Sequence, residues 1–329
     1  MKVPRKILTA SGIFLSLLFL YFAFRNVEWE NIFLLFRETN YFYLIPIVVF
    51  FFADFSLRAL RWKFLLLPVK KCGLLNLLSS VFIGFFANNL LPMRAGEVIR
   101  AFHIGIREKI SKMSALASIA VERVLDGYTV LLALVITFFI FPFDPAVRNI
   151  LIAGAAFFSA CAFIFYFLLY CRELETGIPG KIRGYLVKNR EKAACSVVSS
   201  FIIGLGGLKS RQLLPSALLS AVSWALNALV FLLTARAMGI AISYPGAAFV
   251  MAVTSLGISI PSSPGYIGVF EYFGILAATT IGIPRNEAAG YILFCRIIQT
   301  GLISIAGSFF LLRENISVFQ LGRRAEAET

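Results

Sequence analysis

The hydrophobic residues of this chain fall into nine blocks separated by short polar segments. About 20 consecutive apolar residues cross the hydrocarbon core of a bilayer as one helix, so the pattern predicts an all-α, polytopic membrane protein. No stretch is left for a separate soluble domain, and residues 1–329 are expected to form a single integral membrane domain. The blocks cover 7–24, 41–55, 74–91, 114–141, 149–170, 213–238, 245–260, 266–283 and 287–312.

Three of these blocks, 74–91, 245–260 and 266–283, are short. They border two clusters rich in proline and glycine, LLPMRAGE at 90–97 and IPSSPGYIG at 260–268. Short apolar segments interrupted in this way are typical of broken or re-entrant helices. We therefore predict about six full spans and two re-entrant hairpins, with eight or nine full spans as the alternative.

The distribution of basic residues favours the hairpins. Basic segments at 58–71 and 94–112 flank the block 74–91, and a full crossing would place one of them outside, against the positive-inside rule. With two hairpins, 24 of the 31 Lys and Arg lie inside and both termini are cytoplasmic, in the inner membrane. Three arginines stay at membrane depth, and four basic residues lie outside: Arg25, Arg37, Arg148 and Arg285.

Composition supports a membrane protein and weakens other classes. The chain is 59% hydrophobic and 15% charged, whereas about a quarter of a soluble protein is charged. Its net charge of +14 is spread between apolar blocks, so we expect membrane lipids, anionic or phosphate-bearing, as partners and no nucleic acid. The run 7–24 has no evident cleavage site for a signal peptide and is predicted to remain as the first span.

Few residues are suited to metal or redox chemistry. The five cysteines form no C-x-x-C motif, and His103 is the single histidine. We expect no metal site and no cofactor. The chain also has no P-loop motif, so ATP hydrolysis within it is not expected.

A polar loop and an amphipathic segment occupy residues 171–211. The loop is rich in basic residues, and the apolar positions from 197 to 208 share one helical face. This pattern predicts a cytoplasmic loop followed by an interfacial helix. A helix packed on the protein is the alternative.

Two parts of the chain resemble each other. The pattern P-x-x-x-G at 92–96 recurs at 261–265, and an arginine followed by two apolar residues at 123–126 recurs at 296–299. The offsets are 169 and 173 residues. In the predicted topology the first unit enters from the cytoplasm and the second from outside, as in the inverted repeats of transporters. The repeated units would cover about residues 72–141 and 245–312. The alternative is a chance likeness of apolar helices.

Several charged residues lie within or beside the apolar blocks. A charge at mid-bilayer costs about 2.5–3.5 kcal/mol on insertion scales, so it must be paired or face a cavity. Glu122 and Asp126 lie four residues apart on one helical face, with Arg123 in reach of Asp126. We expect them on a substrate path, with a structural ion pair as the alternative.

A second set, Arg94, Glu97 and Arg100, recurs at intervals of three. Arginine offers bidentate donors for phosphate, and the start of a half-helix adds free N–H groups. These residues are the leading candidates for binding a phosphate-bearing group, and anchoring at the cytoplasmic surface is the alternative.

Further candidates lie in other blocks. Asp54, Arg58 and Arg61 form one stripe and are secondary candidates, with a local interfacial ion pair as the alternative. Glu271 and Arg296, in the second unit, are either a buried pair or part of the substrate path. The hairpins are expected to depend on the residues that break or tighten them: Pro92, Gly96, Pro261, Pro264 and Gly265.

Four motifs in order, LPMRAGEVIRAF, ASIAVERVLDG, IPSSPGYIGVFE and FCRIIQTG, make the chain similar to a known family. It resembles the flippase-like transmembrane domain of lysylphosphatidylglycerol synthases over nearly its whole length. The resemblance implies movement of a lipid between leaflets. The positions that match the motifs are Arg94, Gly96, Glu97, Arg100, Glu122, Arg123, Asp126, Pro261, Pro264, Gly265, Glu271 and Arg296. The chain stops about 17 residues after its last block, so the cytoplasmic synthase domain of such enzymes is expected to be absent.

The leading hypothesis is therefore a lipid transporter and not an enzyme. Its cargo would be a phosphate-bearing lipid, aminoacylated or isoprenoid among the options, and transport would be downhill or driven by a potential or proton gradient. A membrane-embedded transferase with Glu97 or Glu122 as base is the first alternative. A non-transporting partner of a separate lipid-modifying enzyme is the second, and homo-oligomerisation is left open.

Overall fold

In a computed structural model of the chain, every regular element among the described residues is a helix. The description covers residues 5–91, 95–141, 148–149, 152–164, 167, 203–205, 211–260, 263–318 and 321. The predicted loop and interfacial helix at 171–211 lie almost entirely outside this part of the chain.

The first repeated unit extends to four consecutive helices, because a long helix precedes the predicted segment 72–141, just as another precedes 245–312. The unit consists of a long helix, two short ones and another long one. The serine at position 111 caps the last of them, because its side chain accepts a hydrogen bond from the Ser114 N–H. The four are α3 (Leu44–Leu66), α4 (Leu74–Leu90), α5 (Ala95–Glu108) and α6 (Lys112–Phe138).

A second unit repeats the order long, short, short, long. Its helices begin 169, 170, 174 and 173 residues after their counterparts, close to the offsets of the repeated motifs. They are α10 (Leu213–Ala237), α11 (Tyr244–Gly257), α12 (Val269–Thr280) and α13 (Arg285–Glu314), with the short 3-10 helix η3 (Pro264–Tyr266) between α11 and α12.

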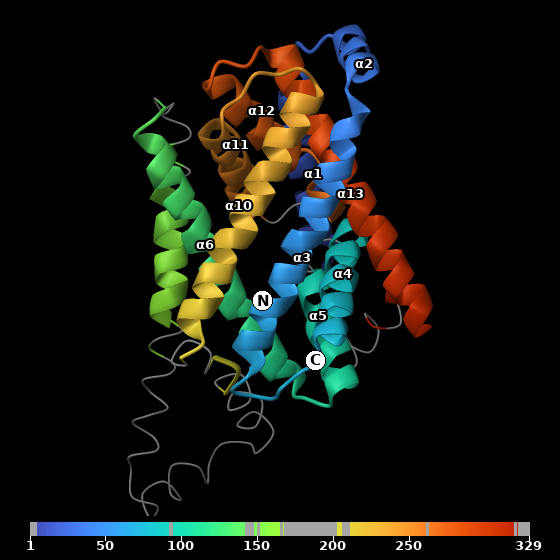
Figure 1. Ribbon diagram of the computed structural model, residues 1–329, viewed down its shortest axis with the longest axis vertical. Coiled ribbons are helices and arrows are strands. Elements are labelled where there is room, and N and C mark those ends of the chain that lie inside the picture. The colour runs from blue at the N-terminus through green and yellow to red at the C-terminus, as the bar shows by residue number, and fades with distance from the viewer. Residues whose placement is uncertain are drawn as a thin grey trace, which may run out of the picture.

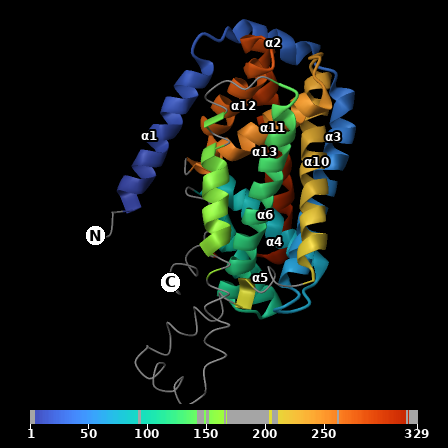
Figure 2. The same ribbon diagram turned by 90° about the vertical axis from the view of Figure 1, so that its left-hand side faces the viewer.

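Further helices lie outside the two units. The helix α1 (Arg5–Phe24) packs on α12 through its last turns, and α2 (Trp29–Glu38) lies across one end of the molecule (Figure 2). The short 3-10 helix η1 (Tyr41–Tyr43) leads into α3. An apolar helix also covers Ile152–Ile164, within the predicted block 149–170.

The two units have opposite orientations. The α4–α5 pair lies at the lower end of the molecule and the α11–α12 pair at the upper end, while α3 and α10 run side by side in opposite directions (Figure 1). The buried apolar side chains accordingly form two clusters, one around α4 and α5 and the other around α11 and α12.

Each pair of short helices begins and ends at the same end of the molecule. In the first pair, the Glu108 carboxylate accepts hydrogen bonds from the Gly73 N–H and the Asn76 amide, both at 2.8 Å. Lys70 donates to the Glu108 carbonyl at 2.6 Å. In the second pair, a Cβ added to Gly246 would lie 3.3 Å from Ile281. Both pairs are therefore helical hairpins.

Small residues allow the arms of the first hairpin to pack closely. A Cβ on Gly96 would lie 1.9 Å from the Gly84 carbonyl oxygen, so no larger residue fits there without a backbone shift. The Asn88 side chain accepts a hydrogen bond from the Gly96 N–H at 2.8 Å. This bond satisfies a donor in the first turn of α5, where helices lack internal partners.

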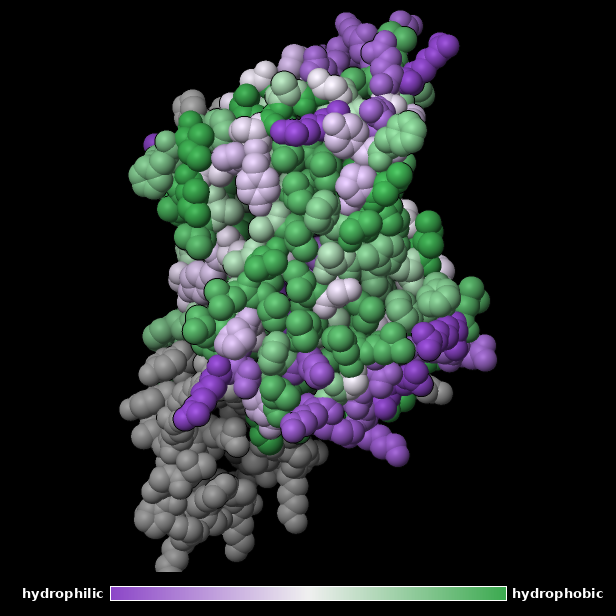
Figure 3. Space-filling model, in the orientation of Figure 1, coloured by the Kyte–Doolittle hydropathy of each residue, from purple (hydrophilic) through white to green (hydrophobic). Residues whose placement is uncertain are grey.

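The surface is that of a membrane protein. Figure 3 shows hydrophobic side chains covering the middle of one face, with hydrophilic residues gathered at both ends. Large apolar residues such as Phe42, Phe139 and Leu312 are about four-fifths exposed. Among the described residues, three segments are long and apolar enough to cross a bilayer: Tyr41–Leu66, Leu213–Ala237 and Arg285–Glu314.

Candidate functional site

The side chain of Arg61 lies at the centre of a buried cluster of charges. It extends from α3 and binds the Asp126 carboxylate of α6 through both terminal nitrogens, at 2.5 and 3.2 Å. The Glu122 carboxylate lies 3.2 Å away. Arg61 and Glu122 are fully buried, so this ion pair is formed inside the protein.

Glu122 also binds the first hairpin. Its two oxygens accept parallel hydrogen bonds from Arg100 of α5, at 2.8 and 2.9 Å, in the bidentate geometry that favours arginine. The Arg100 guanidinium stacks on the Trp62 ring, 3.8 Å from its centroid. Arg123 adds a third contact to Glu122 at 2.9 Å. One carboxylate thus connects α3, α5 and α6.

The helix α10 supplies polar side chains to the same cluster. The Ser220 hydroxyl lies 2.7 Å from Arg61 and 3.1 Å from Asp126, and the Trp224 indole donates to Asp126 at 2.8 Å. Ser223 donates to Asp54, which also pairs with Arg58 at 3.0 Å. These contacts bind the first long helix of the second unit to the charges of the first unit.

The cluster is electrically balanced. Its four arginines face four carboxylates, so the ion pairs can be retained away from water. Arg123 and Glu97 are the most exposed members, each with 26% of the side chain accessible, and their charged atoms are 3.5 Å apart. We call the set the charge cluster: Asp54, Arg58, Arg61, Glu97, Arg100, Glu122, Arg123 and Asp126.

The tips of the two hairpins meet beside the charge cluster. A Cβ on Gly265 would lie 3.5 Å from the Asn89 carbonyl oxygen at the end of α4, and 3.3 Å from the Arg296 guanidinium. Arg296 donates a hydrogen bond to the Gly265 carbonyl. The turn of the second hairpin adopts left-handed backbone at Gly265 (φ 65°) and at Tyr266 (φ 60°). Such backbone is costly for a residue larger than glycine and often marks a functional site.

Tyr266 interacts electrostatically with both repeated arginines, Arg123 and Arg296. Two amide nitrogens, Asn89 Nδ2 at the end of α4 and Gln299 Nε2 one turn after Arg296, are buried without a hydrogen-bond partner among the described residues. In native proteins such donors are usually satisfied by water, an ion or another ligand. We call the set Asn89, Arg123, Tyr266, Arg296 and Gln299 the tip site.

One ion pair is repeated in the two units. Glu97 in the first turn of α5 lies 3.5 Å from Arg123, and Glu271 in the first turn of α12 lies 3.9 Å from Arg296. Glu271 also accepts a hydrogen bond from the Gly268 N–H at 2.7 Å, which caps its helix. The rest of the charge cluster has no counterpart, because Gln299 and Ser223 occupy positions equivalent to Asp126 and Asp54.

The structure brings most of the candidate residues together. Glu97, Arg100, Glu122, Arg123 and Asp126 meet in the charge cluster. Glu271, Arg296 and Gly265 meet at the second hairpin, where Pro264 begins η3, and Gly96 lies between the arms of the first. Arg94, Pro92 and Pro261 lie outside the described residues.

Two features differ from the expectation. Arg100 is a leading candidate for binding a phosphate-bearing group, but it is 2% exposed and is enclosed by Glu122 and Trp62. Arg61, a secondary candidate, is the central residue of the charge cluster. Sequence reasoning also missed the polar residues of α10, although the spacing of Ser220, Ser223 and Trp224 on one face of an apolar block was a usable signal.

Among the described residues, no group of three or more histidine, cysteine or acidic side chains could hold a metal ion. His103 instead lies between Ser80, at 2.7 Å, and Glu314, at 2.6 Å. It connects the first hairpin to the end of α13.

Together, an apolar belt, two helical hairpins and buried charges define an integral membrane protein. The chain belongs to the family described as the lysylphosphatidylglycerol synthase TM region, which it matches over residues 9–307. The expected family resemblance is thereby confirmed.

Relatives of similar length are membrane proteins. A UPF0104 membrane protein of Methanocaldococcus jannaschii is 24% identical over 91% of this chain and 93% of its own length. Another, from Methanothermobacter thermautotrophicus, is 27% identical over 82% of this chain and 85% of its own. The glycosyltransferase AglD of Haloferax volcanii is 26% identical over 39% of this chain and 21% of its own length. No solved structure matches this chain.

Proposed function

We propose that this protein moves a phosphate-bearing lipid between the leaflets of the cytoplasmic membrane, with the tip site holding the headgroup. The proposal rests on the approach of two partly exposed arginines, Arg123 and Arg296, to the Tyr266 turn. Two buried amide donors without a partner among the described residues add to it: Asn89 at the end of α4, and Gln299 one helical turn after Arg296. All four groups donate hydrogen bonds. A phosphate group, which has only acceptor oxygens, is the complementary ligand.

The arrangement of the hairpins supports transport over simple binding. We infer that the two units are inverted repeats and that the hairpins are re-entrant, entering from opposite sides and meeting at the tip site. Their opposite orientation in Figure 1 and the repeated Glu97–Arg123 and Glu271–Arg296 pairs favour this interpretation. Substrate sites of transporters built from inverted repeats lie at such an interface near the midplane.

The proposed topology places both termini in the cytoplasm. The Glu108 contacts join the two ends of the α4–α5 hairpin, so the basic residues at its base belong on one side: Lys63, Lys70, Lys71, Arg107, Lys109 and Lys112. The positive-inside rule makes that side cytoplasmic.

The charge cluster is proposed to act as a rigid support for the tip site. Arg123 belongs to both sets, and its contact with the enclosed Glu122 fixes its position. The remaining arginines of the cluster are already paired with carboxylates. A headgroup would therefore exchange contacts with Arg123 and Arg296 rather than with Arg61 or Arg100.

The test is lipid exchange by the full chain in liposomes. Vesicles of phosphatidylcholine would contain fluorescent phosphatidylglycerol in both leaflets, and a membrane-impermeant quencher would report how fast inner-leaflet lipid becomes accessible. Replacing Arg296 by methionine removes a charge-assisted donor to phosphate, and we expect exchange to fall by about tenfold or more. Arg296→Lys, which keeps the charge, should fall less.

The matched control is Arg236→Met, because Arg236 is an exposed arginine at the end of α10 with no ion pair among the described residues. It should exchange lipid at the wild-type rate. Size-exclusion chromatography would first show that both proteins are folded. Equal exchange rates for wild type and Arg296→Met would then refute the role of the tip site.

A second candidate function is a membrane-embedded transferase acting on a lipid-linked substrate. The partial likeness to the glycosyltransferase AglD favours it. The same vesicles separate the two, because a transferase would form a modified lipid detectable by mass spectrometry. If the vesicles show no lipid exchange and no modified lipid, and an enzyme co-purifies with the chain, the protein would be a non-transporting partner.

A further inference from the structure

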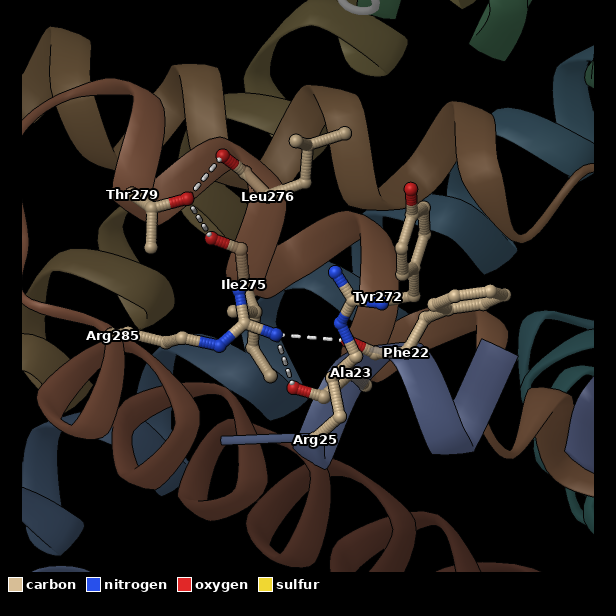
Figure 4. A pocket seen from close by; sticks show the side chains of 8 residues that line it. All are labelled: Phe22, Ala23, Arg25, Tyr272, Ile275, Leu276, Thr279 and Arg285. Carbon is tan, nitrogen blue, oxygen red and sulfur yellow. Dashed lines mark hydrogen bonds between the residues drawn. The ribbon is translucent and has the colours of Figure 1, made fainter. Parts of the chain in front are cut away.

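A separate pocket with unbalanced positive charge lies at the other end of the molecule from the α4–α5 hairpin. It has a volume of about 180 Å³ and lies between the last turn of α1 and the second half of α12 (Figure 4). No acidic residue lines it among the described residues. Its lining residues are Phe22, Ala23, Arg25, Tyr272, Ile275, Leu276, Thr279 and Arg285.

Two arginines reach this pocket from different parts of the chain. Arg25 follows α1 and Arg285 begins α13, and Figure 4 shows both side chains extending into the space beside Tyr272. They are two of the four basic residues that the sequence assigns to the outer side of the membrane. Their convergence leaves a charge of +2 beside apolar walls.

The arginines have donors left for a ligand. Arg285 uses one terminal nitrogen to bind the Phe22 and Ala23 carbonyls, at 2.8 and 3.1 Å, which offsets the negative end of α1. Arg25 lies over the Phe22 ring at 5.3 Å and forms no ion pair among the described residues. The remaining N–H groups of both guanidinium groups can therefore face an anion.

The walls of the pocket indicate an amphiphilic ligand. Tyr272, Ile275 and Leu276 present apolar surface beside the charges. The volume is below the roughly 300–1,000 Å³ of sites for drug-sized ligands, so the pocket accepts a headgroup and not a whole lipid. Apolar chains could continue over α1, where Phe14, Leu17 and Tyr21 are exposed by 60% or more.

We propose that this pocket binds a phosphate group carried by an anionic membrane lipid at the outer end of the protein. The choice of a lipid as the ligand rests on the proposed function, whereas the geometry of the pocket is independent of it. In contrast to the charge cluster, where carboxylates match every arginine, the pocket offers two guanidinium groups without a matching carboxylate. It is therefore suited to receive or release a headgroup at the membrane surface.

The experiment measures binding and not transport. The full chain would be purified in detergent and exposed to phosphatidylglycerol, to phosphatidylcholine or to inorganic phosphate, and bound lipid would be counted by native mass spectrometry. Inorganic phosphate binding would be followed by calorimetry. Loss of one charge-assisted contact in Arg25→Gln should weaken phosphatidylglycerol binding by about tenfold.

Arg37→Gln is the control, because Arg37 is exposed on α2 near the same end and has no ion pair among the described residues. Arg285→Lys keeps the charge and the contact with α1 while losing bidentate binding, so it should weaken binding without unfolding the protein. If phosphatidylglycerol and phosphatidylcholine bind equally, or if Arg25→Gln and Arg37→Gln behave alike, the proposal is overturned.

Comparing phosphatidylglycerol with inorganic phosphate shows whether the bound phosphate belongs to a lipid or is free. Preference for phosphatidylglycerol with no response to inorganic phosphate supports a lipid headgroup, whereas binding of inorganic phosphate alone overturns the lipid assignment. Failure of the proposed transport is recognised independently, since Arg296→Met would then leave exchange unchanged while the pocket still bound lipid.

Discussion

Replacing Glu122 by glutamine should destabilise the protein by removing the carboxylate that three arginines share. Glu122 accepts two bonds from Arg100 and lies within 3.2 Å of Arg61 and 2.9 Å of Arg123. Without it, four arginines face three carboxylates, and one positive charge is left without compensation in an enclosed site.

The expected cost follows from this imbalance. Removing one partner of a buried ion pair costs about 3–5 kcal/mol, because the other charge stays buried. The glutamine carbonyl can still accept one hydrogen bond from Arg100, so we expect a loss near 3 kcal/mol, at the lower end of that range. The exposed control Arg236→Met should change the free energy of unfolding by less than about 0.5 kcal/mol.

A double-mutant cycle separates electrostatics from packing. Arg100→Met alone leaves one negative charge in excess, whereas Arg100→Met combined with Glu122→Gln restores neutrality. The double variant should therefore cost at least about 2 kcal/mol less than the sum of the single variants. The free energy of unfolding would be measured by titrating mixed micelles with a denaturing detergent. Additive losses would refute the neutral charge cluster.

Two further predictions concern the hairpins. Gly265→Leu should reduce lipid exchange more than expression. The positive φ at this position costs a larger residue about 1–2 kcal/mol, and the added Cβ would press on the Arg296 guanidinium. Exchange at the wild-type rate would contradict the tight turn. Glu108 is the last residue of α5, at the base of the first hairpin. Burial raises its pKa, but hydrogen bonds from Asn76 and Gly73 outweigh that effect and leave the pKa below its ordinary value. Glu108 therefore stabilises the fold above the ordinary glutamate pKa and loses this effect as pH falls through its lowered value; thermal unfolding should show Glu108→Gln less stable than wild type at pH 7, with a gap that closes in acid, and a constant gap would exclude this linkage.

Much of the helical layout followed from the chain alone. The apolar blocks 74–91, 245–260 and 266–283 predicted α4, α11 and α12 within a few residues at most ends. The reason is physical, because lipid leaves backbone groups no partner outside the helix, so apolar runs become helices. The offsets of 169 and 173 residues between motifs reappear in the helices themselves.

The predicted block 41–55 ends too early, and the reason is electrostatic. It was closed where charges began, at Asp54 and Arg58, but α3 continues to Leu66. By sequence, Arg58 and Arg61 belong to a basic segment outside the apolar block. Within α3, Arg58 pairs with Asp54, whereas Arg61 is compensated by Asp126 and Ser220 on other helices, which the sequence of one helix cannot reveal.

What the sequence by itself determined was therefore local: helices, interruptions by proline and glycine, and charges that required partners. Only the tertiary structure decided which partners those were. Arg61 meets Asp126 across 65 residues and Ser220 across 159, and Gly265 meets Asn89 at the tips of two hairpins. Periodicity assigns a residue to a face of its own helix, whereas ion pairing between helices depends on how whole helices pack, and that is a property of the folded chain.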